Sequence, residues 1–485
     1  MRRALTVIHT LGLMLVVFSI SYLMPVVASL VYDDGTLIDF LLAMVWTAGT
    51  GVLLWLLTRR YKGELSIRHG YMLVVAMWTA MPAVATLPLL LVIDHLSFTD
   101  AYFETMSGIT TTGATVLTGL DILPPAINLW RHELNWLGGM GIIVLAVAIL
   151  PLLGVGGRQL FKAETPGPMK DAALTPRITE TARNLWLVYA GITLACIASL
   201  KLAGMNWLDA ICHAFAAMGL GGFSTHDASV GYFDSPAIEA VLIVFMLIAA
   251  MNFATHFLVW RAKSLSIYLR DVEGLATVAV TLASCVGIGA FLWWQGTYPG
   301  FLTALRHASF NLVSIATDCG FVSQDFNQWP IFAPMWMLFL SCITVSSGST
   351  GGGIKMVRTI ILFKQAGREF VKLLHPAAVN PMKIGGHVIA NNIVFAVLGF
   401  IFLYFMSVAT LTFMLLISGL DFISAFSAVI ACINNAGPGL GVVGPASNFG
   451  VLTDFQTWVC TFAMLIGRLE IFTMLILFTP HFWMR

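Results

Sequence analysis

The chain has 485 residues, of which 58% are hydrophobic and only 10% are charged. A soluble globular domain carries about 25% charged residues, so this composition excludes an ordinary water-soluble protein. The formal net charge of +1 at pH 7 says little as a total, and we expect no nucleic-acid partner.

Cysteine and histidine are scattered through the chain. The seven cysteines form no CxxC pair, and the eleven histidines form no HExxH motif. These spacings predict neither a zinc site nor a disulfide framework. No paired nucleophile and base suggests an enzyme, so we expect no enzymatic activity and no organic cofactor in this chain.

Apolar spans of about 20 residues, the length that a bilayer requires, predict ten membrane crossings. They lie at residues 8–32, 40–57, 72–93, 134–153, 185–202, 240–260, 275–294, 336–363, 388–417 and 455–478. The first span follows Arg2 and Arg3 and could be a secretory signal. Its apolar run exceeds the usual length of about 7–15 residues, so we expect a retained transmembrane helix.

Four shorter apolar segments lie between alternate pairs of spans, and each consists of about three helical turns followed by a glycine-centred break. When the glycines of the breaks are aligned, a small residue stands six positions earlier in every copy. The glycines are Gly113, Gly222, Gly320 and Gly437, and the small residues are Ser107, Ala216, Ser314 and Ala431. Repetition of this kind is itself an architectural signal.

The pattern predicts an all-α integral membrane protein in which four linked helix–pore loop–helix repeats surround one pore. We expect an N-terminal helix pair in residues 1–68. The four repeats then occupy residues 69–183, 184–271, 272–385 and 386–485, and the second helix of the third repeat is interrupted.

The distribution of Lys and Arg predicts the orientation. If the N-terminus is cytoplasmic, about 20 of the 25 basic residues lie on the cytoplasmic side, as the positive-inside rule requires. About 16 of the 24 acidic residues then lie outside, where they raise the local concentration of cations. All four breaks enter from this acidic face.

The breaks are the candidate ion site. Irregular backbone at membrane depth must be buried in protein or line a water-filled cavity. Four breaks around one axis present carbonyl oxygens, which replace the hydration shell of potassium in cation filters. No charged or aromatic side chain recurs, so we expect the backbone to be the shared ligand. The candidate filter residues are Thr110, Thr111, Thr112 and Gly113; Leu220, Gly221 and Gly222, preceded by Gly219; Thr317, Asp318, Cys319 and Gly320; and Asn434, Asn435, Ala436 and Gly437.

A run of Ser, Gly and Thr at residues 346–353 interrupts the eighth span. Such a run does not hold a lipid-facing helix, because each glycine costs about 1 kcal/mol relative to alanine. We interpret it as a loop below the filter that can occlude the pore; the alternative is a simple helix kink. The candidate gate residues are Ser347, Gly348, Ser349, Thr350, Gly351, Gly352, Gly353, Lys355 and Arg468.

Arg468 and Glu470 lie within the last span, where an ionisable residue suggests function. Two interpretations remain open. Either Arg468 stands beside the ion path below the filter and regulates cations, or Arg468 and Glu470 are structural, in an ion pair with each other or in contacts with Lys355 and backbone carbonyls.

With the four breaks, the motif SSGSTGGGIK at residues 346–355 and the late Arg468, the chain resembles the Trk/Ktr/HKT potassium transporters over essentially its whole length. Within them it is most similar to the membrane subunit of the bacterial Trk system. The resemblance implies potassium uptake through a channel-like pore in the bacterial inner membrane, with both termini cytoplasmic. No loop has TVGYG, so selectivity is expected to be less strict, and rubidium is expected to pass.

The resemblance further implies a homodimer and a cytoplasmic TrkA-type ring that binds NAD(H), ATP or ADP and regulates the pore. The alternative function is a symporter that couples potassium to protons or sodium. Broken helices also mark transporters, but the sequence has no inverted repeat, and Glu470 is the one candidate proton carrier in a span.

Overall fold

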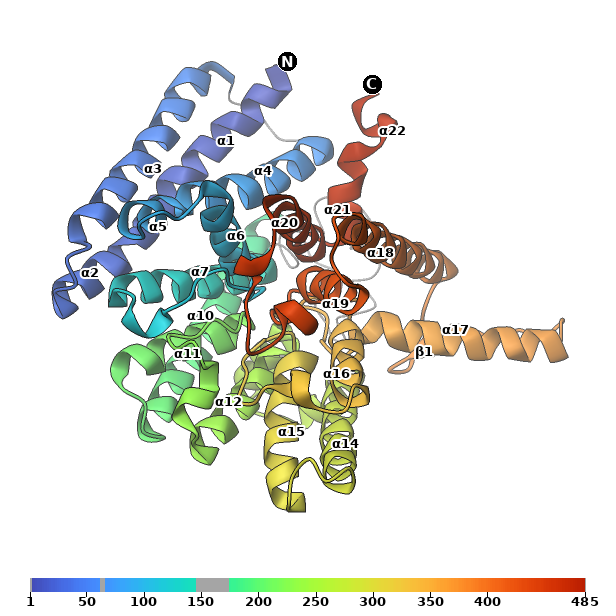
Figure 1. Ribbon diagram of the computed structural model, residues 1–485. Coiled ribbons are helices and arrows are strands. Elements are labelled where there is room, and N and C mark those ends of the chain that lie inside the picture. The colour runs from blue at the N-terminus through green and yellow to red at the C-terminus, as the bar shows by residue number, and fades with distance from the viewer. Residues whose placement is uncertain (1, 62–65, 145–173, 485) are drawn as a thin grey trace.

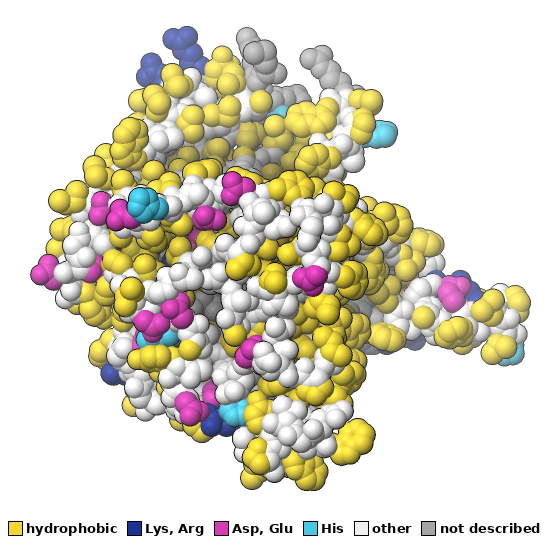
Figure 2. Space-filling view, in the orientation of Figure 1, with side chains coloured by type: hydrophobic (Ala, Val, Ile, Leu, Met, Phe, Trp, Pro, Cys, Tyr) yellow, Lys and Arg dark blue, Asp and Glu magenta, His cyan; other side chains and the backbone are white. Residues whose placement is uncertain are grey.

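The computed structural model describes residues 2–61, 66–144 and 174–484, and these are mostly helical (Figure 1). The sheet in these residues is one antiparallel pair, β1 (Lys383–Ile384) and β2 (His387–Val388). The predicted all-α membrane fold is therefore confirmed. Large apolar side chains on the outer surface (Figure 2) are what a bilayer-embedded protein exposes to lipid.

An N-terminal helix pair precedes the repeats. It consists of α1 (Arg2–Phe18), α2 (Leu23–Tyr32) and α3 (Leu37–Thr58), and α1 and α2 together form one span. Tyr22, between α1 and α2, stacks on Trp130 at 4.5 Å between ring centroids and donates a hydrogen bond to the carbonyl of Val84 at 2.9 Å. These contacts attach the helix pair to the helices that follow.

The remaining helices follow one another around a central axis in chain order (Figure 1). The first group is α4 (Ile67–Ala85), α5 (Leu87–Val92), α6 (Phe98–Ile109) and α7 (Pro125–Val144), and the second is α10 (Leu174–Leu202), α11 (Trp207–Gly219), α12 (Pro236–Ala249) and α13 (Phe253–Ala262). The third is α14 (Val272–Trp294), α15 (Phe301–Ala316), α16 (Phe332–Ile343) and α17 (Met356–Leu374). The fourth is α18 (Asn391–Ile417), α19 (Phe422–Ile433), α20 (Asp454–Arg468), α21 (Ile471–Leu475) and α22 (Pro480–Trp483).

The number of unbroken spans is smaller than the sequence suggests. Within the described ranges, six helical spans are long and apolar enough to cross a membrane alone. The expected span 336–363 is divided into α16 and α17, as predicted, and the expected span 134–153 begins in α7 and runs into residues outside the described ranges.

In the second and fourth repeats, the long helix that follows the glycine-centred break is also broken, which the sequence did not predict. Helices α12 and α13 meet at 94°, and α20 meets α21 and the 3-10 turn after it at 113°. In the first case Asn252 starts a new helix, because its side chain accepts a hydrogen bond from the Ala254 N–H. In the second, Glu470 has a positive φ of 55°. In both cases the apolar composition continues through the bend and hides it.

Helices α1 and α3 approach so closely that two glycines face each other. A Cβ at Gly51 would lie 2.7 Å from the carbonyl oxygen of Gly12, and a Cβ at Gly12 would lie 2.8 Å from the carbonyl oxygen of Gly51. Small residues allow this approach of helix backbones within a membrane.

We predict that Gly51→Leu separates α1 from α3 and destabilises the protein by about 1–3 kcal/mol, as overpacking does. The measurement is the thermal unfolding midpoint and the yield of monodisperse protein in detergent. Gly49→Leu is the matched control, because no atom lies within 4 Å of a Cβ built at this exposed position. Equal effects of the two substitutions would contradict the packing argument.

Candidate ion pore

Four short helices lead into the four loops, and three of them begin at a polar cap. Ser97, Asn206 and Asp421 accept hydrogen bonds from the backbone N–H three residues later and start α6, α11 and α19. Helix α15 begins after Gly300 without a side-chain cap. The four helices end at the loops, so the partial negative charge of each helix C-terminus favours a cation there.

The loops leave these helices by the same hydrogen bond in every copy. The N–H of the residue before each aligned glycine donates to the carbonyl of the residue six positions before that glycine, at 2.8 Å. The four pairs are Thr112 to Ser107, Gly221 to Ala216, Cys319 to Ser314, and Ala436 to Ala431. This is the Schellman arrangement of a helix C-terminus. The small residues aligned in the sequence are thus the hydrogen-bond acceptors of the four helix ends.

The backbone conformation of the loops also repeats. Two positions in each loop have positive φ, the aligned glycine and the residue two before it. The values are 54° and 79° at Thr111 and Gly113, 53° and 60° at Leu220 and Gly222, 62° and 93° at Asp318 and Gly320, and 59° and 89° at Asn435 and Gly437. A positive φ is uncommon for residues other than glycine, so four different side chains are held in one backbone shape.

The four glycines are arranged in a closed ring. A Cβ built on Gly113 would overlap the carbonyl oxygen of Gly221, and one on Gly222 would overlap that of Cys319. A Cβ on Gly320 would lie 2.7 Å from the carbonyl oxygen of Ala436, and one on Gly437 would lie 2.9 Å from that of Thr112. Each glycine therefore contacts the carbonyl that precedes the glycine of the next loop, and the fourth loop returns to the first.

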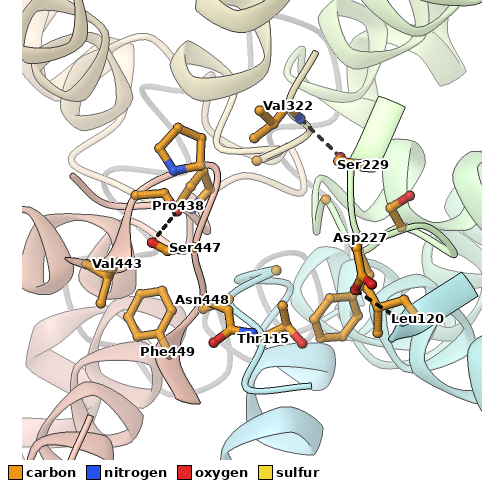
Figure 3. Close-up of a pocket in the computed structure, with 18 of the residues that line it drawn as sticks. Thr115, Leu120, Asp227, Ser229, Val322, Pro438, Val443, Ser447, Asn448 and Phe449 are labelled. Carbon is orange, nitrogen blue, oxygen red and sulfur yellow. Dashed lines mark hydrogen bonds between the residues drawn. The ribbon is translucent and has the colours of Figure 1, made fainter. Parts of the chain in front are cut away.

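A pocket opens directly above this ring (Figure 3). It is lined by Gly113, Gly222 and Gly320, by Pro438 after the fourth glycine, and by the outer loops that carry Thr115, Asp227 and Asn448. On the face seen in Figure 2, acidic side chains lie around the central hollow, and among the exposed acids are Asp121, Asp227 and Asp234. The mouth of the pocket is therefore favourable for cations.

The residues between α16 and α17 lie on the opposite side of the ring from the pocket. Thr350 Oγ1 donates to the carbonyl of Met218 at 3.0 Å, and the Gly352 N–H donates to Asp318 Oδ2 at 3.1 Å. A Cβ on Gly352 would overlap the carbonyl of Asn434, and one on Gly351 would lie 3.1 Å from the carbonyl of Thr317. This stretch, which we call the intramembrane loop (residues 344–355), thus contacts the inner ends of the third and fourth loops and the last turn of α11, which leads into the second loop.

The other candidate gate residues hold the intramembrane loop in place. The Ser347 N–H donates to Glu273 Oε1 at 2.6 Å, and the carbonyl of Gly348 accepts from the Phe253 N–H at 3.1 Å. Ser349 Oγ and Lys355 Nζ each make a 2.5 Å hydrogen bond within the loop, to the carbonyls of Ser346 and Gly351. Gly353 has a positive φ of 69°. A simple kink in a continuous helix does not describe these residues.

Arg468 ends α20 beneath the loops and is 2% exposed. It donates to the carbonyl of Thr350 at 2.7 Å and to the carbonyl of Gly138 at 3.0 Å. The alternative in which Arg468 pairs with Glu470 is wrong, because the Glu470 carboxylate binds Arg358 at 2.8 Å. Backbone carbonyls hold Arg468, one of them in the intramembrane loop.

Two glycines in the helices that follow the first and fourth loops were not predicted from the sequence as part of the site. A Cβ on Gly138 in α7 would overlap the carbonyl of Ile109, and one on Gly467 in α20 would overlap the carbonyl of Ile433. Ile109 and Ile433 are the last residues of α6 and α19. The signal was present, since both glycines stand inside otherwise apolar spans, but only the fold shows what they touch.

Comparison with protein-family models matches residues 38–484 to the TrkH family, which is described as a cation transport protein. This match covers well over half of the sequence. The chain belongs to the TrkH family.

Individual relatives of this TrkH-family chain match it end to end. It is 46% identical over 482 residues to the Trk system potassium uptake protein TrkH of Salmonella typhimurium, with 99% of each chain covered. It is 39% identical to the Trk system potassium uptake protein TrkG of Escherichia coli, with 98% of each covered. The crystal structure of the potassium transporter TrkH from Vibrio parahaemolyticus superposes with a TM-score of 0.92 at 43% identity, covering 99% of this chain and 100% of that one.

A histidine bridges two outer loops of this TrkH-family protein beside the pocket. His226 lies 2.5 Å from Asp121 and 3.3 Å from Asp209, and its ring stacks on Tyr232 at 3.6 Å between centroids. Partial burial by itself lowers the pKa of His226, but the hydrogen bonds and charges of the two carboxylates outweigh it and raise this pKa above its ordinary value. The bridge is therefore strongest when His226 is protonated.

We predict that this bridge stabilises the outer mouth at acidic pH. A raised histidine pKa in the folded state gives stability that is fully present below the unfolded pKa of about 6.5 and is lost as pH rises through the folded pKa. The unfolding midpoint of the wild type should therefore fall relative to that of His226→Asn as the pH rises above about 6.5. His481→Asn, at an exposed histidine in α22, is the control and should keep the wild-type profile. Parallel profiles for wild type and His226→Asn would contradict the bridge.

Proposed function

We propose that this protein takes up potassium ions through a single channel-like pore, with the four loops as its selectivity filter. The observation that carries the proposal is the ring in which each glycine contacts the carbonyl before the next glycine. Membership of a family of cation transport proteins, and full-length relatives named for potassium uptake, support the choice of ion.

Potassium suits this site because the repeated ligands are backbone carbonyls. Carbonyl oxygens replace the hydration shell of a weakly hydrated cation. The side chains at the four equivalent positions are Thr112, Gly221, Cys319 and Ala436, and they share no ligand chemistry. Rubidium, which is similar in charge and size, is expected to pass as well.

The membrane potential is sufficient to drive uptake. Moving one charge is worth about 2.3 kcal/mol per 100 mV. At roughly 150 mV this supports accumulation on the order of 300-fold without another energy source. No contact of the described residues favours coupling to protons or sodium.

We further propose that the intramembrane loop and Arg468 form the gate. The loop lies against the inner ends of the third and fourth filter loops and the last turn of α11, and Arg468 is bound to its Thr350 carbonyl. Residues 347–353 and Lys355 contribute through the contacts described above. Movement of this stretch away from the filter would open the path.

The setting of the pore is also a proposal. The balance of basic residues favours cytoplasmic termini, and relatives named for a Trk system support a partner subunit. We propose that this partner is a TrkA-type cytoplasmic regulatory ring, and that the chain forms a homodimer in the bacterial inner membrane with one pore in each protomer. On this proposal, NAD(H), ATP or ADP binds the ring and not this chain.

The proposal is tested by reconstituting the purified chain into liposomes and measuring potassium, rubidium, sodium and lithium flux separately. We expect flux of potassium and rubidium that follows the imposed membrane potential. Flux that requires a proton or sodium gradient at a fixed stoichiometry would instead identify a symporter.

We predict that Gly113→Ser admits sodium. The residue has a φ of 79°, and a Cβ there overlaps the Gly221 carbonyl, so the first quarter of the filter must distort. The measurement is the ratio of rubidium to sodium flux. Gly119→Ser is the matched control, since Gly119 has a similar φ of 70° but no atom closer than 3.5 Å to its Cβ. Full discrimination against sodium in Gly113→Ser would reject the filter assignment at this loop.

We predict that Arg468→Ala raises potassium flux at normal yield without changing which ions pass. The substitution removes a positive charge below the filter and the hydrogen bond that holds Thr350. Arg468→Lys is the informative control, because it keeps the charge but not the two-carbonyl geometry. Unchanged flux from well-folded Arg468→Ala would show that the residue does not hold the gate closed.

A further inference from the structure

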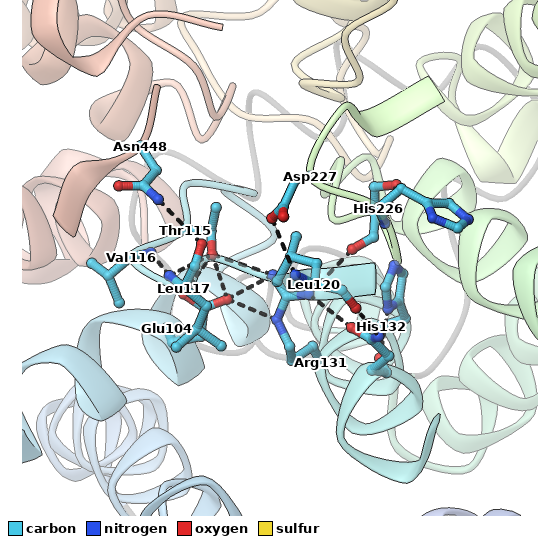
Figure 4. Close-up of polar contacts among 12 residues, drawn as sticks. Glu104, Thr115, Val116, Leu117, Leu120, Arg131, His132, His226, Asp227 and Asn448 are labelled. Atoms are coloured by element: carbon cyan, nitrogen blue, oxygen red, sulfur yellow. Dashed lines mark hydrogen bonds and ion pairs between the residues drawn. The ribbon is translucent and has the colours of Figure 1, made fainter. Parts of the chain in front are cut away.

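A buried ion pair lies beside the pocket, between α6 and α7. Arg131 Nη2 is 2.8 Å from Glu104 Oε1, and Arg131 Nε also donates to this oxygen at 2.8 Å. The two side chains are 1% and 0% exposed. Figure 4 shows them pointing toward each other at the centre of a group of polar contacts.

Glu104 holds the non-helical segment that follows the first filter glycine. We call the segment directly after each filter glycine an exit strand, although it belongs to no sheet. Thr115 Oγ1 donates to both carboxylate oxygens at 3.0 Å, and the Val116 N–H donates to Oε2 at 3.0 Å. Thr115 is two residues after Gly113. The carboxylate therefore fixes the outward course of the chain as it leaves the ring.

Arg131 extends this contact to the neighbouring quarter of the pore. Its Nη1 donates to the carbonyl of Ser224 at 3.2 Å, and its guanidinium carbon lies 4.4 Å from the ring centroid of Phe223. Phe223 and Ser224 directly follow Gly222. The ion pair thus joins the exit strands of the first and second filter loops. These two loops also meet in the ring, where Gly113 contacts the carbonyl of Gly221.

A comparable but uncharged contact occurs in the other three quarters. The residue nine before the glycine is Glu104 in the first copy, and its equivalents are His213, Asn311 and Ala428. His213 Nε2 is 3.0 Å from Ser224 Oγ, and Asn311 exchanges two hydrogen bonds of 3.0 Å with Ser323. In the fourth copy, Ser427 accepts from the Leu440 N–H at 2.8 Å. Every exit strand is therefore hydrogen-bonded to the short helix of its own repeat.

We propose that the Glu104–Arg131 ion pair is a specificity-determining positioning element that sets the separation of the first and second filter loops. This inference rests on the filter assignment proposed above. Of these four contacts between a short helix and its exit strand, the contact at Glu104 extends through the side chain of Arg131 to the backbone carbonyl of Ser224 in the next loop. Neither residue touches the ion; both act through the strands that follow Gly113 and Gly222.

Charge neutralisation explains why the two residues occur together. Arg131 lines the pocket above the ring, where an uncompensated positive charge would repel entering cations. Glu104 cancels this charge at 2.8 Å. Removing one partner of a buried pair leaves an unpaired charge and strongly destabilises a protein, whereas removing both charges is often tolerated. The informative variant is therefore the double neutral one.

The experiment compares the ratio of rubidium to sodium flux in liposomes for wild type and for Glu104→Gln/Arg131→Gln. We expect normal yield and a ratio lowered roughly tenfold, equivalent to about 1.4 kcal/mol of discrimination. Thr115→Val, which removes one hydroxyl and no charge, should lower the ratio by about threefold, the value of one hydrogen bond. This second variant decides the question if the double variant does not fold.

Glu239→Gln/Arg306→Gln is the control, because this ion pair of 2.7 Å joins α12 to α15. The other carboxylate that Arg306 binds, Asp234 at 2.9 Å, lies twelve residues beyond Gly222 and outside the segment that Arg131 holds. The flux ratio of this control should stay at the wild-type value. A wild-type ratio in the folded double variant, or in Thr115→Val, overturns the positioning role, as does an equal fall in the control. If Gly113→Ser lowers the ratio and the ion-pair variants do not, only this inference fails; if none lowers it, the filter assignment fails.

Discussion

The structure depends on the requirement that backbone polar groups at membrane depth find partners inside the protein. Four helices end within the bilayer, and the last four C=O groups of each, about sixteen in all, lack partners within the helix. Each end solves the problem with the same hydrogen bond, from the residue before the glycine to the small residue at the last turn. On the proposed function, carbonyls that this bond leaves unpaired are the ones that face a cation. The ion path would then be a consequence of how the helix ends are closed.

Covalent linkage lets the four quarters share a backbone while their side chains diverge. The positive-φ position before each glycine holds Thr111, Leu220, Asp318 or Asn435, although only glycine adopts this conformation without strain. Ring closure compensates, because each loop is held by its own helix and by the carbonyl of its neighbour. Divergence then allows each quarter its own neighbours: Asp318 binds the intramembrane loop, and Asn435 donates to Thr112 of the first loop at 2.9 Å.

Charged groups close to the ion path are bound to fixed partners. Arg131, above the ring, is neutralised by Glu104, while Arg468, below it, is held by the carbonyls of Thr350 and Gly138. Burial of a charge is costly unless it is paired or hydrogen-bonded. On the two proposals, the paired cation above the ring keeps the geometry of the filter constant, and the cation below binds the segment proposed as the gate.

Much of this protein follows from the sequence alone. The length of an apolar run indicates a membrane helix, because the thickness of the bilayer sets that length. The aligned glycines indicate the four helix ends, because the chain turns after each helix with a positive φ at Gly113, Gly222, Gly320 and Gly437. The interruption at 346–353 is visible because an unbroken run of Ser, Gly and Thr has a low helix propensity, whereas single glycines occur in many apolar spans. The bends at Asn252 and Glu470 are not visible, since apolar composition is the same in a straight and in a bent span. Glu470 belongs to Arg358 rather than Arg468, and Arg131 reaches Ser224 from another repeat. Such pairings are decided only by the tertiary structure, because proximity in sequence does not determine which side chains share a buried space once the backbone has turned.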